Sequence, residues 1–270
     1  VSLEILKNFP SIQMGYEMAV LSLNGKNSFE LFPSKFTDGT DSIPINGLIW
    51  MGEIDFMKAQ IKQKIDEGFD CLKLKIGALP FEKELELLSE IRNEFSKDEM
   101  IIRVDANGGF SPDDVMDKLN KLANLDIHSI EQPIKANQRK RMSSICSKTP
   151  VPIALDEELI GVFDPLDRES LLDQVSPQYI ILKPSLLGGF KSCEHWIELA
   201  EQRSIGWWVT SALESNIGLN AIAQWTYQLG ITSHQGLGTG GLFSNNIDSP
   251  LQVKPGQLKF NINSCWNTKF

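Results

Sequence analysis

The sequence predicts a parallel α/β barrel, and three observations lead to this fold class. From about residue 43 onward, short β-branched runs alternate with amphipathic stretches of helical period, which is typical of parallel α/β architecture. Eight strands are expected, with helices between most of them, and this pattern fits a closed barrel better than a doubly wound open sheet. No Gly-x-Gly-x-x-Gly motif follows the first strand, so a dinucleotide-binding sheet is not supported.

The expected elements recur once per β/α unit. The candidate strands lie near residues 45–50, 71–76, 101–106, 127–132, 151–156, 179–184, 206–211 and 233–237. The helices expected between them include 55–67, 81–95, 112–122, 190–203 and 219–229. Ser111 before Pro112 provides an N-cap and a first helical position, and Gly68 directly follows the first of these helices. These terminal residues agree with the periodicity.

Composition and charge exclude several classes of protein. The 270 residues are 41% hydrophobic and 23% charged, as in a globular protein, and the net charge of −9 comes without a dense basic cluster. Nucleic acid and anionic membranes are therefore poor candidate partners. The four cysteines form no Cys-x-x-Cys pair, which argues against a zinc site or a disulfide framework. No apolar run approaches the roughly 18 residues that span a bilayer, so we expect a soluble, cytoplasmic protein.

Charged residues occupy strand positions where a barrel interior is usually apolar. In strand 71–76, Leu72, Leu74 and Ile76 share the face that packs on the helices, which directs Lys73 and Lys75 inward. By the same alternation, Arg103 and Asn107 point inward from the next strand, and each of the next four strands directs a charged side chain inward near its end. The charged residues near the strand ends are Asp105, Glu131, Asp156 and Lys183. The carboxyl ends of the strands form the rim where barrel enzymes place their chemistry.

Three buried carboxylates need a cation, because like charges and desolvation otherwise favour protonation. Asp105, Glu131 and Asp156 offer only oxygen ligands, which suits Mg²⁺, or alternatively Mn²⁺, better than zinc. The lysines flank the carboxylates in strand order and should face each other across the metal. A neighbouring ammonium on Lys73 favours the neutral, basic form of Lys75. The alternatives are ordinary carboxylates at strand ends and a Lys73 that serves only as an ion-pair partner.

Five motifs resemble the muconate-lactonizing subgroup of the enolase superfamily in order and spacing. They are Lys73-Leu-Lys75, Arg103-Val-Asp105-Ala-Asn107, Ile130-Glu131-Gln-Pro, Leu155-Asp156-Glu-Glu and Ile181-Leu-Lys183-Pro-Ser. The resemblance implies a modified TIM barrel, (β/α)₇β, in which the three carboxylates bind Mg²⁺ and the metal holds a substrate carboxylate. It implies that Lys75 removes the proton α to that carboxylate, that Lys183 is a second cation and that Lys73 tunes Lys75. Glu157 and Glu158, beside a ligand, are expected to be solvated or to support the ligands.

Within the subgroup, two segments are most similar to o-succinylbenzoate synthases of menaquinone biosynthesis. They are residues 236–243, Gly-Leu-Gly-Thr-Gly-Gly-Leu-Phe, and residues 210–218, Thr-Ser-Ala-Leu-Glu-Ser-Asn-Ile-Gly. These lyases dehydrate 2-succinyl-6-hydroxy-2,4-cyclohexadiene-1-carboxylate to 2-succinylbenzoate. Backbone N–H groups around Thr239, Gly240 and Gly241 are expected to bind the succinyl carboxylate, with Ser211 as a second candidate. The glycines alternatively serve only a turn.

Several other functions use the same residues. An N-succinylamino-acid racemase, or another enzyme of the subgroup, would use Lys75 and Lys183 as bases on opposite faces of one carbon. A dipeptide epimerase is disfavoured, because that branch has Asp-x-Asp where this chain has Gly238-Thr-Gly240. A Schiff-base aldolase would use Lys183 as a nucleophile. An alternative of another functional class is a barrel that binds a metal or ligand without catalysis.

Three regions are expected along the chain. Residues 1–42 are interpreted as the remnant of an N-terminal capping domain, residues 43–243 as the barrel, and residues 244–270 as a segment packing back toward the cap. Val1 is not a start methionine, and only a helical part near 11–22 resembles the cap, so we expect an N-terminal truncation and reduced closure over the substrate. The partner expected is a small carboxylate, and the oligomeric state stays open.

Overall fold

The computed structural model describes residues 3–25 and 27–267, which form two compact units. The first unit comprises residues 1–46, 182–197 and 208–270, and the second comprises residues 47–181 and 198–207. The boundaries expected at residues 42 and 243 stay predictions.

A seven-stranded sheet contains the predicted strands in chain order. Its strands are β2 (Gly47–Ile49), β3 (Cys71–Lys75), β4 (Ile101–Asp105), β5 (Ser129–Glu131), β6 (Ile153–Leu155), β7 (Tyr179–Leu182) and β8 (Gly206–Val209). The ladders from β2 through β7 are parallel. Because each strand pairs with the next one in the chain, the carboxyl ends of neighbouring strands lie side by side. This arrangement confirms the expected α/β class with a modified TIM-barrel sheet.

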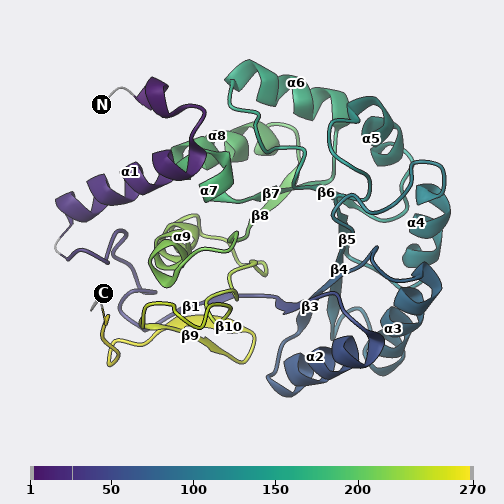
Figure 1. Ribbon diagram of the computed structural model, residues 1–270, viewed down its shortest axis with the longest axis horizontal. Coiled ribbons are helices and arrows are strands. Elements are labelled where there is room, and N and C mark those ends of the chain that lie inside the picture. Colours follow the sequence, from purple (N-terminus) through teal and green to yellow (C-terminus); the bar gives the residue numbers. More distant parts are fainter. Residues whose placement is uncertain (1–2, 26, 268–270) are drawn as a thin grey trace. The chain divides into compact units, whose positions relative to one another are not determined.

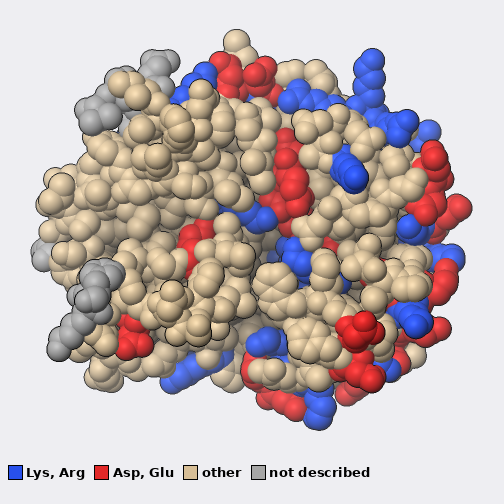
Figure 2. All heavy atoms as spheres, viewed as in Figure 1, with Lys and Arg blue, Asp and Glu red and all other residues tan. Residues whose placement is uncertain are grey.

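Helices of the second unit cover one side of its strands, as Figure 1 shows for the region β3 to β6. They are α2 (Ile54–Asp66), α3 (Phe81–Glu94), α4 (Val115–Ala123), α5 (Arg139–Cys146) and α6 (Pro165–Val175). Leu72 and Leu74 of β3 are fully buried, as expected for the face toward the helices. Charged side chains are numerous on the outer surface of these helices (Figure 2).

Local sequence determines where these helices begin. Asp164 accepts a hydrogen bond from the backbone N–H of Leu166 and caps α6, whose first residue is Pro165. The predicted helix 112–122 begins later, at Val115, because residues 112–114 form a turn in which the carbonyl of Ser111 accepts the N–H of Val115. Pro112 therefore lies in the turn rather than in the first turn of α4.

The first unit contains η1 (Leu3–Leu6), α1 (Pro10–Asn24), α7 (Pro184–Leu187), α9 (Asn216–Gln228) and most of α8 (Gly189–Glu201). Its antiparallel sheet has the order β1 (Ser42–Pro44), β10 (Gln257–Phe260) and β9 (Leu251–Lys254). Aromatic pairs connect early and late parts of the chain: Phe29 stacks on Trp266 with ring centroids 4.3 Å apart, and Phe36 contacts Phe260. Residues near both ends of the chain thus pack against each other in this unit.

The predicted eighth strand, 233–237, forms isolated bridges rather than a continuous ladder. Gln235 bridges Ile45 and Gly236 bridges Thr210, both in parallel direction. A Cβ atom on Gly236 would lie 2.0 Å from Oγ1 of Thr210, so only glycine permits this approach. Across the described part of the chain, no helix has the length and apolar character needed to cross a bilayer.

Candidate active site

The three predicted carboxylates lie at the ends of neighbouring strands in the second unit. Asp105 ends β4, Glu131 ends β5, and the two residues are paired in register. Asp156 directly follows β6. Their exposed fractions are 0%, 2% and 2%, respectively, so all three carboxylates are buried. Asp105 and Glu131 both contact Lys73, so they share one face of neighbouring strands, as period-two alternation predicts.

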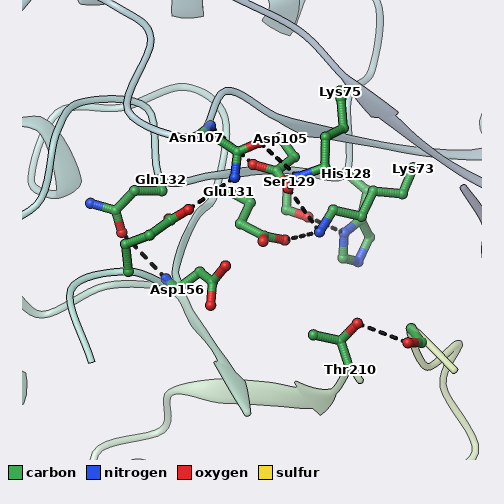
Figure 3. Close-up of polar contacts among 12 residues, drawn as sticks. Lys73, Lys75, Asp105, Asn107, His128, Ser129, Glu131, Gln132, Asp156 and Thr210 are labelled. Atoms are coloured by element: carbon green, nitrogen blue, oxygen red, sulfur yellow. Dashed lines mark hydrogen bonds and ion pairs between the residues drawn. The ribbon is translucent and has the colours of Figure 1, made fainter. Parts of the chain in front are cut away.

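Two lysines of β3 supply positive charge to this cluster. Lys73 Nζ lies 3.0 Å from Oδ2 of Asp105 and also forms an ion pair with Glu131 (Figure 3). Lys75, which is in register with Asp105, donates a hydrogen bond of 2.9 Å to the same Oδ2 atom. Both lysines therefore point toward the carboxylates, as predicted. Lys73 is an ion-pair partner, which agrees with the alternative that it has no direct chemical role but does not exclude such a role.

The ion pairs determine the protonation of the buried groups. Burial alone lowers the pKa of Lys73, but the carboxylates of Glu131 and Asp105 outweigh it and raise that pKa above its ordinary value. Burial raises the pKa of Asp105, whereas the ammonium groups of Lys73 and Lys75 lower it well below its usual range. These two shifts both favour the charged forms, an ammonium on Lys73 and a carboxylate on Asp105.

The oxygen ligands of the three carboxylates fit Mg²⁺, but the arrangement of these carboxylates in the structure is not that of a bound metal. Asp105, Glu131 and Asp156 provide oxygen ligands only, the type that hard divalent cations prefer. Within residues 3–25 and 27–267, however, no three His, Cys, Asp or Glu side chains are grouped as for a bound metal. The ammonium of Lys73 lies against Asp105 and Glu131 instead. Ligation by these two residues would therefore compete with their ion pairs to Lys73.

Asn107 and Glu157 extend the cluster in a way that the sequence analysis did not assign. Oδ1 of Asn107 accepts a hydrogen bond of 2.7 Å from Lys75 Nζ, and its Nδ2 donates one of 2.9 Å to Oε1 of Glu157. Asn107 has a left-handed backbone, with φ of 43°, which asparagine tolerates better than most residues. Burial raises the pKa of Glu157, and the charge of Asp156 adds to that effect. Strand alternation predicts an inward-pointing Asn107, but it does not predict the hydrogen bond between Asn107 and Lys75.

Gln132 and Glu158 fix the loops that follow β5 and β6. Oε1 of Gln132 accepts the backbone N–H groups of Asp156 and Glu158, both at 3.3 Å. Nε2 of Gln132 donates to the carbonyl of Ile134 at 3.0 Å, and Glu158 accepts the N–H of Asn137. These contacts hold the backbone on either side of Asp156. Glu158 is buried rather than solvated.

The remaining predicted residues lie in the first unit. Lys183 precedes α7, and its carbonyl accepts the N–H groups of Leu186 and Leu187. Ser211 Oγ and Thr239 Oγ1 are 2.5 Å apart, so the structure brings two of the substrate-binding candidates together. A Cβ on Gly240 would lie 2.8 Å from Oδ1 of Asn216, whereas nothing lies within 4 Å of such an atom on Gly241. Lys75 belongs to the second unit and Lys183 to the first. The expectation that the two lysines face each other therefore stays a prediction.

Comparison with known proteins gives consistent matches. The sequence model described as enolase C-terminal domain-like matches residues 56–261. The o-succinylbenzoate synthase of Desulfotalea psychrophila is 54% identical over 250 residues, which cover 93% of this chain and 68% of that protein. The L-amino acid-D/L-Glu epimerase of Francisella philomiragia is 30% identical over 195 residues, covering 71% of this chain and 53% of the epimerase.

Solved structures show the same relationship. The crystal structure of MenC from Desulfotalea psychrophila has a TM-score of 0.87 and 53% identity, covering 93% of this chain and 69% of that one. The muconate lactonizing enzyme from Pseudomonas putida has a TM-score of 0.76 and 26% identity, covering 92% and 69%, respectively. The chain thus spans about two thirds of the length of these enzymes.

Proposed function

Because this chain belongs to the enolase C-terminal domain-like family, we propose that it is an o-succinylbenzoate synthase, a hydro-lyase of menaquinone biosynthesis. The observation that carries the proposal is the buried cluster of lysines and carboxylates at the ends of β3 to β5. The 54% identity to a synthase over 93% of the chain supports the choice of reaction. The substrate would be 2-succinyl-6-hydroxy-2,4-cyclohexadiene-1-carboxylate.

Lys75 is the proposed base. It lies at the carboxyl end of β3, where Asp105 and Asn107 hold its ammonium nitrogen in place. Neutral Lys75 would take the proton from the carbon α to the ring carboxylate, and the electron pair left behind would form a new ring double bond as the C–O bond breaks. The proton then leaves with the hydroxyl group as water, which balances the dehydration. The aromatic ring of the product favours the reaction.

Asp105, Glu131 and Asp156 are the proposed ligands of Mg²⁺, with Mn²⁺ as a substitute. The bound ion would supply a Lewis acid that holds the ring carboxylate and stabilises negative charge on it. Without the ion, Lys73 would compensate the charge of Asp105 and Glu131, with which it forms ion pairs. Lys183 would contribute a second positive charge, an assignment supported by its Ile181-Leu-Lys183-Pro-Ser motif.

The succinyl carboxylate is assigned to residues of the first unit. The hydroxyl groups of Ser211 and Thr239 lie together, and the space beside Gly241 is open. Backbone N–H groups around Thr239, Gly240 and Gly241 would bind the carboxylate, since glycine leaves room for close approach. A second candidate function, racemisation of N-succinylamino acids, would use Lys75 and Lys183 as bases on opposite faces of one carbon, and an L-amino acid-D/L-Glu epimerase is among the more distant relatives.

The test is the loss of cyclohexadiene absorbance when the 270-residue chain meets the proposed substrate, with Mg²⁺ and then with EDTA. We expect magnesium-dependent loss in the wild type and none in Lys75→Ala, with folding and Mg²⁺ affinity retained. Lys83→Ala, which removes an exposed lysine of α3, is the matched control and should retain full activity. Unimpaired turnover by Lys75→Ala would contradict the assignment of the base, and racemisation without dehydration would favour the second function.

A further inference from the structure

Helix α1 has a single charged residue, Glu17, and that residue is buried. The exposed fraction of Glu17 is 8%, although the other fourteen residues of this 15-residue helix carry no charge. Burial raises the pKa of Glu17. An uncompensated buried carboxylate is strongly unfavourable, so the contacts that stabilise it indicate what it does.

The carboxylate of Glu17 lies against the start of α8. Its Oε2 accepts a hydrogen bond of 2.6 Å from the backbone N–H of Phe190, the second residue of that helix. A helix N-terminus has unpaired N–H groups and a partial positive charge, both of which favour a carboxylate. Gly189 has φ of 88°, and a Cβ atom there would lie 2.5 Å from the same Oε2. Gly189 and Glu17 therefore fit each other closely.

Helix α1 also contacts the residues that precede α8. We call residues 183–189, which comprise Lys183, the short helix α7, Gly188 and the first residue of α8, the Lys183 turn. Oγ of Ser11 donates a hydrogen bond of 2.8 Å to the carbonyl of Ser185, within this turn. Gly188 and Gly189 both have left-handed backbones, a pair with little intrinsic preference for one conformation. Ser11 binds α1 to the turn before this pair and Glu17 binds α1 to the helix after it.

We propose that Glu17 is a positioning residue for Lys183. The backbone of Lys183 is part of the turn, since its carbonyl accepts the N–H groups of Leu186 and Leu187. A carboxylate that fixes the far end of the turn restricts the conformations available to the lysine at its near end. The inference rests on the proposed catalytic role of Lys183, but the contacts themselves lie entirely within the first unit.

The kinetic test compares three variants of the 270-residue chain. Glu17→Ala should lower kcat on the order of 100-fold, as expected for a catalytic group displaced by about 1 Å, while KM stays within about twofold. Glu17→Gln keeps an acceptor for the N–H of Phe190 and should restore kcat to within about threefold of the wild type. Leu23→Ala, at a position of α1 that is 85% exposed, is the matched control and should leave kcat unchanged. An unchanged kcat in Glu17→Ala would overturn the proposal.

A second measurement does not depend on turnover. The rate of reductive methylation of Lys183, followed by mass spectrometry and normalised to exposed Lys83, should change more than about twofold in Glu17→Ala and not in Leu23→Ala. If the wild type shows no dehydration, the proposed function fails, yet this labelling still tests the positioning role. If Glu17→Ala does not fold, Ser11→Ala, which removes the contact to Ser185, replaces it. A labelling rate of Lys183 that is unaffected in the folded variants would refute the inference.

Discussion

Lys73 is the residue on which the charge balance of the buried cluster depends. It forms ion pairs with both Asp105 and Glu131, and it is itself buried. Removing one partner of a buried ion pair leaves charge without compensation, which is far more unfavourable than losing a surface pair. The metal proposed for the same carboxylates would supply that compensation instead. Lys73 and the metal are thus expected to substitute for each other in part.

This expectation can be measured with Lys73→Met. In the absence of divalent cations, the free energy of unfolding should fall by about 3–5 kcal/mol, because the buried carboxylates of Glu131 and Asp105 both lose the ammonium group of Lys73. Mg²⁺ should restore part of the loss, as followed by urea denaturation with and without the ion. Lys64→Met, which removes the partly exposed Lys64–Glu67 pair, should change stability by only about 0–1 kcal/mol. A loss below about 1 kcal/mol in Lys73→Met would show that the buried pairs contribute little.

Two substitutions of Asn107 can distinguish the contribution of its left-handed backbone from that of its side-chain hydrogen bonds. Asn107→Gly retains the left-handed φ without strain but loses the hydrogen bonds to Lys75 and Glu157, whereas Asn107→Ala loses the bonds and adds strain. We expect both variants to lower kcat by a similar factor of about ten. The melting temperature should be lower in Asn107→Ala than in Asn107→Gly, because only alanine adds backbone strain. Equal kcat in Asn107→Gly and the wild type would exclude a role in holding Lys75.

The positions of Lys73, Lys75, Asp105, Glu131 and Asp156 could be predicted because strand periodicity alone determines which face a side chain occupies. The contacts of Asn107 could not, since they depend on a left-handed turn after β4 and on the loop that carries Glu157. Distance along the chain gave no indication of this pairing. The ion pairs of Lys73 with two carboxylates at once also required the register of three neighbouring strands.

At the scale of elements, glycine is required sterically at Gly236 but not at Gly15 in α1. Gly236 bridges Thr210 so closely that a methyl group has no room, whereas no neighbouring atom lies within 4 Å of a Cβ on Gly15, inside α1. The regular elements with clear periods were predictable. The segment 233–237 was expected as a strand, but its pairing reduces to single bridges because Gly236 is tied to Thr210 and Gln235 to Ile45.

Two substitutions test this contrast. Gly236→Ala should destabilise the chain by about 1–3 kcal/mol, because the added methyl group overlaps Thr210. Gly15→Ala should stabilise it by about 0.5–1 kcal/mol, since alanine favours a helix interior and meets no obstacle. Denaturant unfolding of both variants beside the wild type gives the two values. The same sign for both changes would contradict the packing described around these glycines.

At the scale of the whole molecule, the net charge of −9 complicates any experiment on metal binding. An acidic protein gains stability from any added cation, because salt screens the repulsion between its carboxylates. A specific site predicts more than this general effect, since an ion that binds only the folded chain stabilises it in proportion to the logarithm of its concentration over Kd. The comparison must therefore hold ionic strength constant.

We expect Mg²⁺ at about 100 times its Kd to stabilise the folded chain by about 2.7 kcal/mol, and to raise the melting temperature by about 5–10 °C for a chain of this length. NaCl at equal ionic strength should produce a much smaller shift, and EDTA should reverse the effect of Mg²⁺. Asp105→Asn should abolish the shift, because it removes a buried ligand, whereas Asp113→Asn, at an exposed position, should preserve it. If NaCl and Mg²⁺ shift the wild type equally, or if Asp105→Asn responds as the wild type does, then the stabilisation comes from screening and Asp105, Glu131 and Asp156 do not form the metal site.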